Sequence, residues 1–170
     1  SSITVHALPK DGPPMVVDHR TGKFREHELF DLMLDLSYTW GSWVWGIEAI
    51  AGQRVLIPFF QVLLAGKLLN HSVEMIPLMA GKGDPKVSRI TSFVSLMAKG
   101  EYAVYEGAVE FTTQLLNYNR KKKSNRDDLL DSAAYGPQML LQYEGLLVAS
   151  YQAGGLEQVE VQTGMEVSSV

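Results

Sequence analysis

Carboxylates occur at two places in the sequence where they have the chemistry to bind metal ions. Glu48 directly follows the apolar segment Trp43–Ile47. A carboxylate at the end of a buried strand needs a partner, because burying it alone is costly. That partner is either a divalent cation or a group of the protein itself, such as Arg54 or a helix N-terminus.

A second group of acids opens a segment with helical spacing. Asp127 and Asp131 are four residues apart and Asp128 and Asp131 are three apart, so these carboxylates share one helical face and repel each other. One Asp in a first helical turn commonly caps backbone N–H groups, but three exceed that need. Mg²⁺ or Mn²⁺, which prefer hard oxygen ligands, would relieve the repulsion. Because the chain has no cysteine, thiolate metal sites are excluded.

The one dense basic cluster lies immediately before these aspartates. It comprises the run Arg120–Lys123 and then Arg126. Its candidate contacts to DNA phosphates are Lys121, Lys122, Lys123 and Arg126. The alternative is a solvated loop without function.

Length and composition favour one compact domain. The chain has 170 residues, of which 46% are hydrophobic and 20% charged. Its net charge of −4 argues against binding DNA through a general electrostatic field, so local charge must decide. The apolar stretch Val55–Leu69 is too short to span a membrane, and we expect a buried helix there. Nothing at the N-terminus resembles a signal peptide, and we expect a soluble intracellular protein.

Hydrophobic periodicity predicts alternating strands and helices. A β-hairpin is expected from residues 2–8 and 15–18. Further strands are expected at 43–47, 73–79 and 102–105, and helices at 26–41, 54–69, 86–100, 108–117 and 125–143, the last with a kink at Pro137. This order predicts an α/β fold, a mixed central β-sheet flanked by helices on both faces. We expect one domain over residues 1–150 and a mobile tail over 151–170.

Three blocks of the sequence together resemble a known family. They are Ile47–Gln53 with Leu56 and Phe60, then Lys86–Ile90, then Arg126–Tyr135. In content, order and separation they resemble the nuclease domain of bacteriophage large terminases, which is RNase H-like and related to Holliday-junction resolvases. The opening residues 2–8 and 10–12 resemble the second and third strands of that domain. The resemblance covers roughly residues 1–145.

The resemblance implies a catalytic site that binds two Mg²⁺ or Mn²⁺ ions. Glu48 would bridge or bind one ion, Asp128 would be the second acid, and Asp131 or Asp127 would support it. Two ions about 4 Å apart would activate water for attack on a phosphodiester. Lys86 and Arg89 would face phosphates near the cut, and the alternative for these two is a solvated first turn.

The first acid of that family lies on a strand that precedes the hairpin. This sequence begins at Ser1, so we expect residues 1–150 to lack that first strand and to cleave DNA poorly. Asp18 is the one early candidate for a substitute, although it belongs to a different strand. The G-x-x-x-x-G-K-[ST] loop of the ATPase motor does not occur in the sequence either.

Taken together, the resemblance implies a metal-dependent endonuclease that cuts double-stranded DNA during viral genome packaging. The resemblance implies that it works in the host cell cytoplasm with a portal, a small terminase subunit and an ATPase domain. Two alternatives remain open. One is a non-catalytic docking or structural remnant of a packaging motor with the same fold, and the other is a generic α/β domain whose aspartates only cap a helix.

Overall fold

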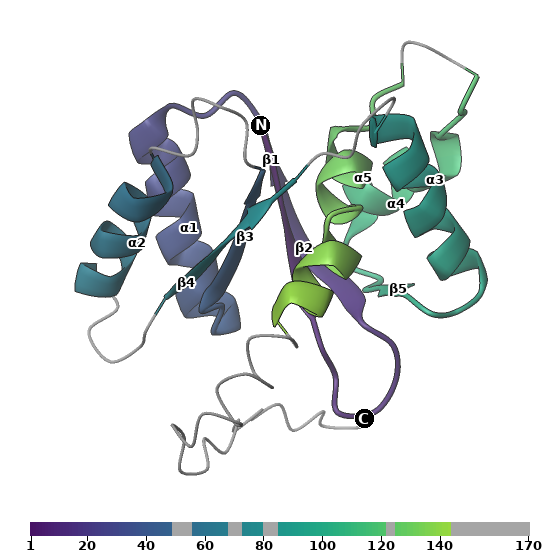
Figure 1. Ribbon diagram of the computed structural model, residues 1–170. Helices are drawn as coiled ribbons and strands as arrows, with labels where there is room; N and C mark the ends of the chain where they lie inside the picture. Colours follow the sequence, from purple (N-terminus) through teal and green to yellow (C-terminus); the bar gives the residue numbers. More distant parts are fainter. Residues whose placement is uncertain (49–55, 68–72, 80–84, 122–124, 144–170) are drawn as a thin grey trace.

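A computed structural model describes residues 1–48, 56–67, 73–79, 85–121 and 125–143 of the chain. The fold is mixed α/β, as the sequence predicts, with strands in the middle and helices on both sides. Figure 1 shows helices α1 (Glu26–Trp40) and α2 (Leu56–Lys67) on one side of the strands and α3 (Pro85–Ala98), α4 (Val109–Asn117) and α5 (Asp128–Ala133) on the other. No helix in the described ranges is long and apolar enough to cross a membrane.

The predicted hairpin is confirmed. Strands β1 (Ser2–Ala7) and β2 (Met15–Thr21) pair antiparallel, with a bulge where Val5 faces Asp18 and His6 faces Val16. The two-residue strand β5 (Ala103–Val104) then adds parallel to β2. These strands form a three-stranded sheet in the order β1-β2-β5.

The second pair of strands comes from the middle of the chain. Helix α1 ends at Gly41, whose φ of 61° is a left-handed conformation that favours glycine. Strand β3 (Val44–Glu48) follows and pairs in parallel with β4 (Glu74–Leu78). Glu48 stands opposite Leu78 in this register. The predicted positions of both strands are therefore confirmed.

The described strands form two sheets, whereas the sequence predicted a single central one. In the described part of the chain β1 pairs only with β2, and β3 pairs only with β4. The expectation that β3 is a buried strand is also wrong, since Trp45 is its only buried residue. Pairing between distant segments is not encoded in local periodicity, so the sequence could not reveal this division.

Two helical predictions need correction. Helix α2 does not lie deep in the core, since Phe60 and Leu64 are buried but Val62 is 72% exposed. The expected helix 125–143 is divided: α5 ends at Ala133, and a turn at residues 134–135 precedes helical residues 136–143. Pro137 explains the division, because it lacks an N–H and its ring would clash with the carbonyl of Ala133 four residues earlier.

Two large hydrophobic clusters hold the helices to opposite faces of the strands. One joins α1 and α2 to the strands through residues such as Val17, Leu36 and Phe60. The other joins α3, α4 and α5 to β2 and includes Val16 and Phe111. Val16 and Val17 enter different clusters because successive strand residues point to opposite faces.

Candidate functional site

Glu48 ends strand β3, and its partner is a tyrosine. The hydroxyl of Tyr135 donates a hydrogen bond of 2.6 Å to Glu48 Oε1. Tyr135 lies in the turn after α5, one helical turn beyond Asp131. The carboxylate that was expected to need a partner therefore has one within the protein, and it comes from the segment that carries the aspartates.

The aspartates of α5 lie against the two basic residues at the start of α3. Lys86 Nζ is 2.8 Å from Asp127 Oδ1 and 3.8 Å from Asp131 Oδ2, and Arg89 Nη2 donates to Asp131 Oδ1. These cations offset the repulsion between Asp127 and Asp131. Lys86 and Arg89, expected to face phosphates, contact carboxylates in this structure.

Arg89 connects the aspartates to Glu48. Its guanidinium carbon lies 3.9 Å from the centroid of the Tyr135 ring, which is the geometry of a cation–π contact. A continuous network, here called the acid–base network, therefore runs through the side chains of Glu48, Tyr135, Arg89, Asp131, Lys86 and Asp127. Arg89 Nε is buried within it and has no hydrogen-bond partner among the described residues.

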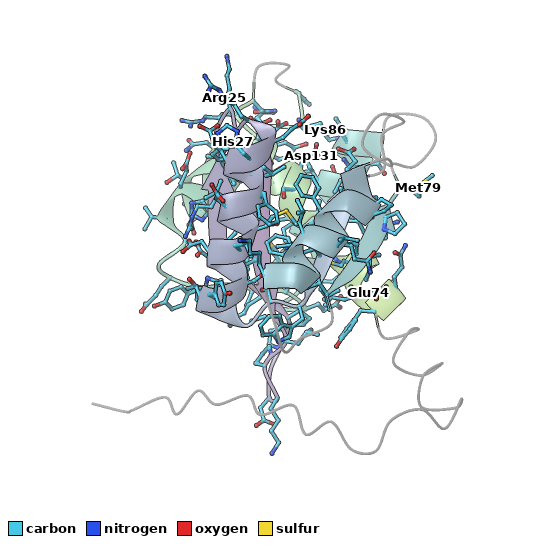
Figure 2. All side chains as sticks on the ribbon, turned by 90° about the vertical axis from the view of Figure 1, so that its left-hand side faces the viewer. Arg25, His27, Glu74, Met79, Lys86 and Asp131 are labelled. Carbon is cyan, nitrogen blue, oxygen red and sulfur yellow. The ribbon has the colours of Figure 1, made fainter. Side chains whose placement is uncertain are left out.

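The acid–base network lies at the carboxyl ends of the parallel strands. Figure 2 shows Lys86 and Asp131 at the same end of the molecule as Met79, which follows β4, and far from Glu74, which begins it. Since β3 runs parallel to β4, Glu48 ends at this edge as well. Reactive groups of open α/β sheets gather at such edges.

Two pKa values in the acid–base network are shifted. Burial by itself would lower the pKa of Lys86, but the hydrogen bond to Asp127 and the charges of Asp131, Asp127 and Asp128 raise it above its usual value. Burial and the hydrogen bond to Glu48 raise the pKa of Tyr135. Lys86 therefore stays charged and Tyr135 stays a hydrogen-bond donor at neutral pH.

Asp128 is set apart from the other acids. Its side chain is exposed, and in the described part of the chain its carboxylate makes no ion pair. Its backbone carbonyl accepts a 2.8 Å hydrogen bond from Ser2 Oγ, which fixes the start of α5 to β1. Asp128 is thus available to an external cation, in contrast to Asp127 and Asp131.

The donor chemistry fits a divalent metal ion better than the donor positions do. The acids offer hard oxygen atoms, and Glu48 Oε2 and the Asp128 carboxylate lie outside the contacts just described. However, no three acidic or histidine side chains within the described ranges lie close enough together to hold a metal. A metal would therefore have to draw Asp131 away from Lys86 and Arg89.

The other candidate residues lie outside the acid–base network. Arg126 is 77% exposed and pairs with Glu110 at 3.0 Å, and Lys121 is exposed. Lys122 and Lys123 lie outside the described residues. Asp18 pairs with Arg20 and accepts a 2.9 Å hydrogen bond from Trp40 Nε1, so it is engaged elsewhere in the fold.

A cleft of about 340 Å³ opens beside the acid–base network, between the two sheets. Residues of both β1 and β3 line it, and so do Asp131 and Tyr135. A second polar group lies in its wall: His6 Nδ1 bonds to the Tyr102 hydroxyl, and His6 Nε2 lies 3.0 Å from Thr4 Oγ1. Burial lowers the pKa of His6 to about 4, so this imidazole is neutral at pH 7.

Sequence reasoning did not identify the roles of Tyr135 and His6. For Tyr135 a signal existed, since it follows Asp131 by four residues and therefore falls next to it on a helical face. His6 gave no such signal, because its partner Tyr102 is distant in the sequence.

Comparison with known proteins adds no relative: no family model, no curated protein and no solved structure matches this chain.

Proposed function

We propose that this protein is an RNase H-like nuclease domain of the large terminase type, which hydrolyses phosphodiester bonds of double-stranded DNA with Mg²⁺ or Mn²⁺. The observation that carries the proposal is the joining of Glu48, at the end of β3, with Asp131 of α5 through Tyr135 and Arg89. Two acids far apart in the sequence thus reach one polar site, with two cations beside them.

The strand arrangement is compatible with this fold. An antiparallel hairpin precedes a parallel pair, and helices cover both faces. The terminase assignment and its partners, a portal, a small terminase subunit and an ATPase domain in the host cell cytoplasm, rest on the sequence resemblance.

In the proposed site Glu48, Asp128 and Asp131 would hold the metal, with Asp127 in support. The bound ion would polarise the phosphate and lower the pKa of a water molecule. Lys86 and Arg89, released from the carboxylates, would bind the phosphodiester, since Arg offers a planar pair of donors to phosphate. Tyr135 would hold Glu48 in position through its hydroxyl. Lys121–Lys123 and Arg126 would contact the DNA backbone further away.

Competition between Lys86 and the metal gives a direct test. We expect Lys86→Met to raise Mn²⁺ affinity about fivefold, since a partly exposed positive charge beside the acids contributes on the order of 1 kcal/mol against a cation. Lys99→Met, an exposed lysine just after α3, is the matched control and should leave affinity unchanged. Isothermal titration calorimetry measures both. No Mn²⁺ binding by either protein would contradict the metal site.

Cleavage is tested by plasmid relaxation with variants checked for folding by circular dichroism. Glu48→Ala and Asp128→Ala should abolish any Mn²⁺-dependent nicking, and Asp131→Asn should reduce it less. Charge reversal at Lys121–Lys123 should weaken binding to all DNA sequences alike and flatten its salt dependence. Undiminished nicking by a folded Glu48→Ala protein would remove Glu48 from the catalytic site.

A non-catalytic docking module is the second candidate function. The observation in its favour is that Lys86 and Arg89 already neutralise Asp127 and Asp131. A stable fold that binds neither Mn²⁺ nor DNA would support this candidate over the nuclease.

A further inference from the structure

Helix α4 turns an uncharged face toward the solvent. Its residues Phe111 and Gln114 are buried on the side that packs against the core. Val109 and Leu116 lie on the opposite side and are 67% and 80% exposed. Thr113 is exposed between them, and these three residues are here called the α4 face. Exposed apolar side chains lined up on one face favour an interaction surface, whereas side chains scattered singly do not.

The polar groups of the α4 face are already bonded within the helix. The Thr113 hydroxyl donates a hydrogen bond of 2.8 Å to the carbonyl of Val109, so its methyl group is left to contact a neighbour. Asn117 Nδ2 donates to the carbonyl of Thr113 at 2.8 Å. Glu110 is the one charged residue of α4, and it pairs with Arg126 at 3.0 Å. Covering the α4 face would therefore leave no hydroxyl and no charge without a partner, which keeps the cost of desolvation low.

The two ends of the α4 face carry opposite charges. Glu106 lies just before the helix, and Arg120 and Lys121 lie just after it. All three residues are exposed, and within the described ranges none of them makes an ion pair. The basic end is held in place by Asn119, whose Oδ1 accepts a 3.0 Å hydrogen bond from the backbone N–H of Lys121.

We infer that the α4 face binds the α4 face of a second copy of this chain, with the two helices antiparallel about a twofold axis that passes beside Thr113. Val109 of each copy then meets Leu116 of the other. Glu106 of each copy comes opposite Arg120 of the other, so opposite charges meet at both ends. A twofold interface requires a surface that matches itself when it is turned round. The α4 face does so, because its centre is apolar and its ends differ in the sign of their charge.

The contact is small, so we expect a weak dimer. Val109 and Leu116 are about 10 Å apart along the helix axis at 1.5 Å per residue. A contact of one short helix per copy lies at the small end of specific interfaces, which typically bury roughly 800 Å² per partner. We therefore expect a Kd of about 100 μM. This inference does not depend on the nuclease proposal, because no residue of the α4 face belongs to the acid–base network or lines the cleft.

Sedimentation equilibrium of the full chain, at concentrations that bracket this Kd, measures the association. The weight-average mass should rise with concentration from that of one chain toward that of two. Leu116→Lys should weaken the dimer about tenfold or more, because it replaces two apolar contacts per dimer with two charges that lose water. Val62→Lys is the matched control, since Val62 is an apolar residue of α2 that is 72% exposed, and it should leave the Kd unchanged.

Exchange of the end charges tests the antiparallel arrangement. Glu106→Lys and Arg120→Glu should each weaken self-association about threefold, because like charges then face each other at both ends and exposed pairs contribute little each. An equimolar mixture of the two variants should regain the affinity of the unchanged chain, since opposite charges again meet at both ends of the mixed dimer.

Three results would overturn the inference. A chain that stays monomeric at the highest concentration would show that the α4 face does not bind itself. A dimer that Val62→Lys weakens and Leu116→Lys does not would place the interface elsewhere on the molecule. A mixture of the two charge variants that associates no more tightly than either variant alone would exclude the antiparallel arrangement.

Discussion

The hydrogen bond between Tyr135 and Glu48 should contribute measurably to stability. Tyr135→Phe removes only the hydroxyl that lies 2.6 Å from Glu48 Oε1 and keeps the ring under Arg89. A hydrogen bond to a charged group contributes about 1.5–3 kcal/mol. Because Glu48 is only half-buried, we expect the lower part of that range, about 1.5–2 kcal/mol. For a chain of this size the corresponding fall in Tm is about 5 °C.

Urea denaturation and thermal unfolding measure the change. Tyr105→Phe is the matched control, since Tyr105 is 48% exposed and its hydroxyl makes no hydrogen bond within the described residues. Glu48→Gln keeps an acceptor oxygen and should cost less than about 1 kcal/mol. The double variant should show a coupling of about 1–2 kcal/mol between the two positions. Equal stability of Tyr135→Phe and Tyr105→Phe would refute the reasoning.

Further predictions concern acid stability and two glycines. The pKa of His6 is about 4 in the folded protein and 6.5 when the side chain is exposed. Between these pH values the unfolded chain binds more protons than the folded one. The free energy of unfolding therefore falls as the pH drops from 6.5 to 4, by at most about 3 kcal/mol. Urea denaturation at a series of pH values should show this loss of stability in the control variant His27→Gln but not in His6→Gln. Gly46→Ala should destabilise by about 1–3 kcal/mol, since its Cβ would lie 2.6 Å from Leu78 Cδ1. Gly66→Ala, on the open face of α2, should stabilise by about 0.5–1 kcal/mol in the same urea assay.

The positions of the elements could be predicted because they depend on local pattern. Apolar residues three and four positions apart predicted α1, and alternating apolar and polar residues predicted the hairpin. Gly41 and Pro137 also acted locally, the first by ending a helix and the second by dividing one. The sequence alone was therefore sufficient for the order and type of the elements.

The site could be predicted only in part, since its contacts are non-local. The sequence selected Glu48, Asp131, Lys86 and Arg89, and the structure places all of them in the acid–base network. It did not predict that the cations would lie on the aspartates. Whether Lys86 faces a phosphate or a carboxylate depends on how α3 packs against α5, and that packing is set by distant hydrophobic residues such as Ile90 and Leu130.

Tyr135 joins the acid–base network to the cleft between the sheets, and this has a consequence for the proposed metal site. Its hydroxyl holds Glu48, its ring lies under Arg89, and the same residue lines the cleft beside β3. A metal that draws Asp131 from Arg89 would change the charge above the ring of the side chain that fixes Glu48. Tyr135→Phe should therefore change Mn²⁺ affinity, and linkage requires that bound Mn²⁺ changes the stability lost in Tyr135→Phe by the same free energy.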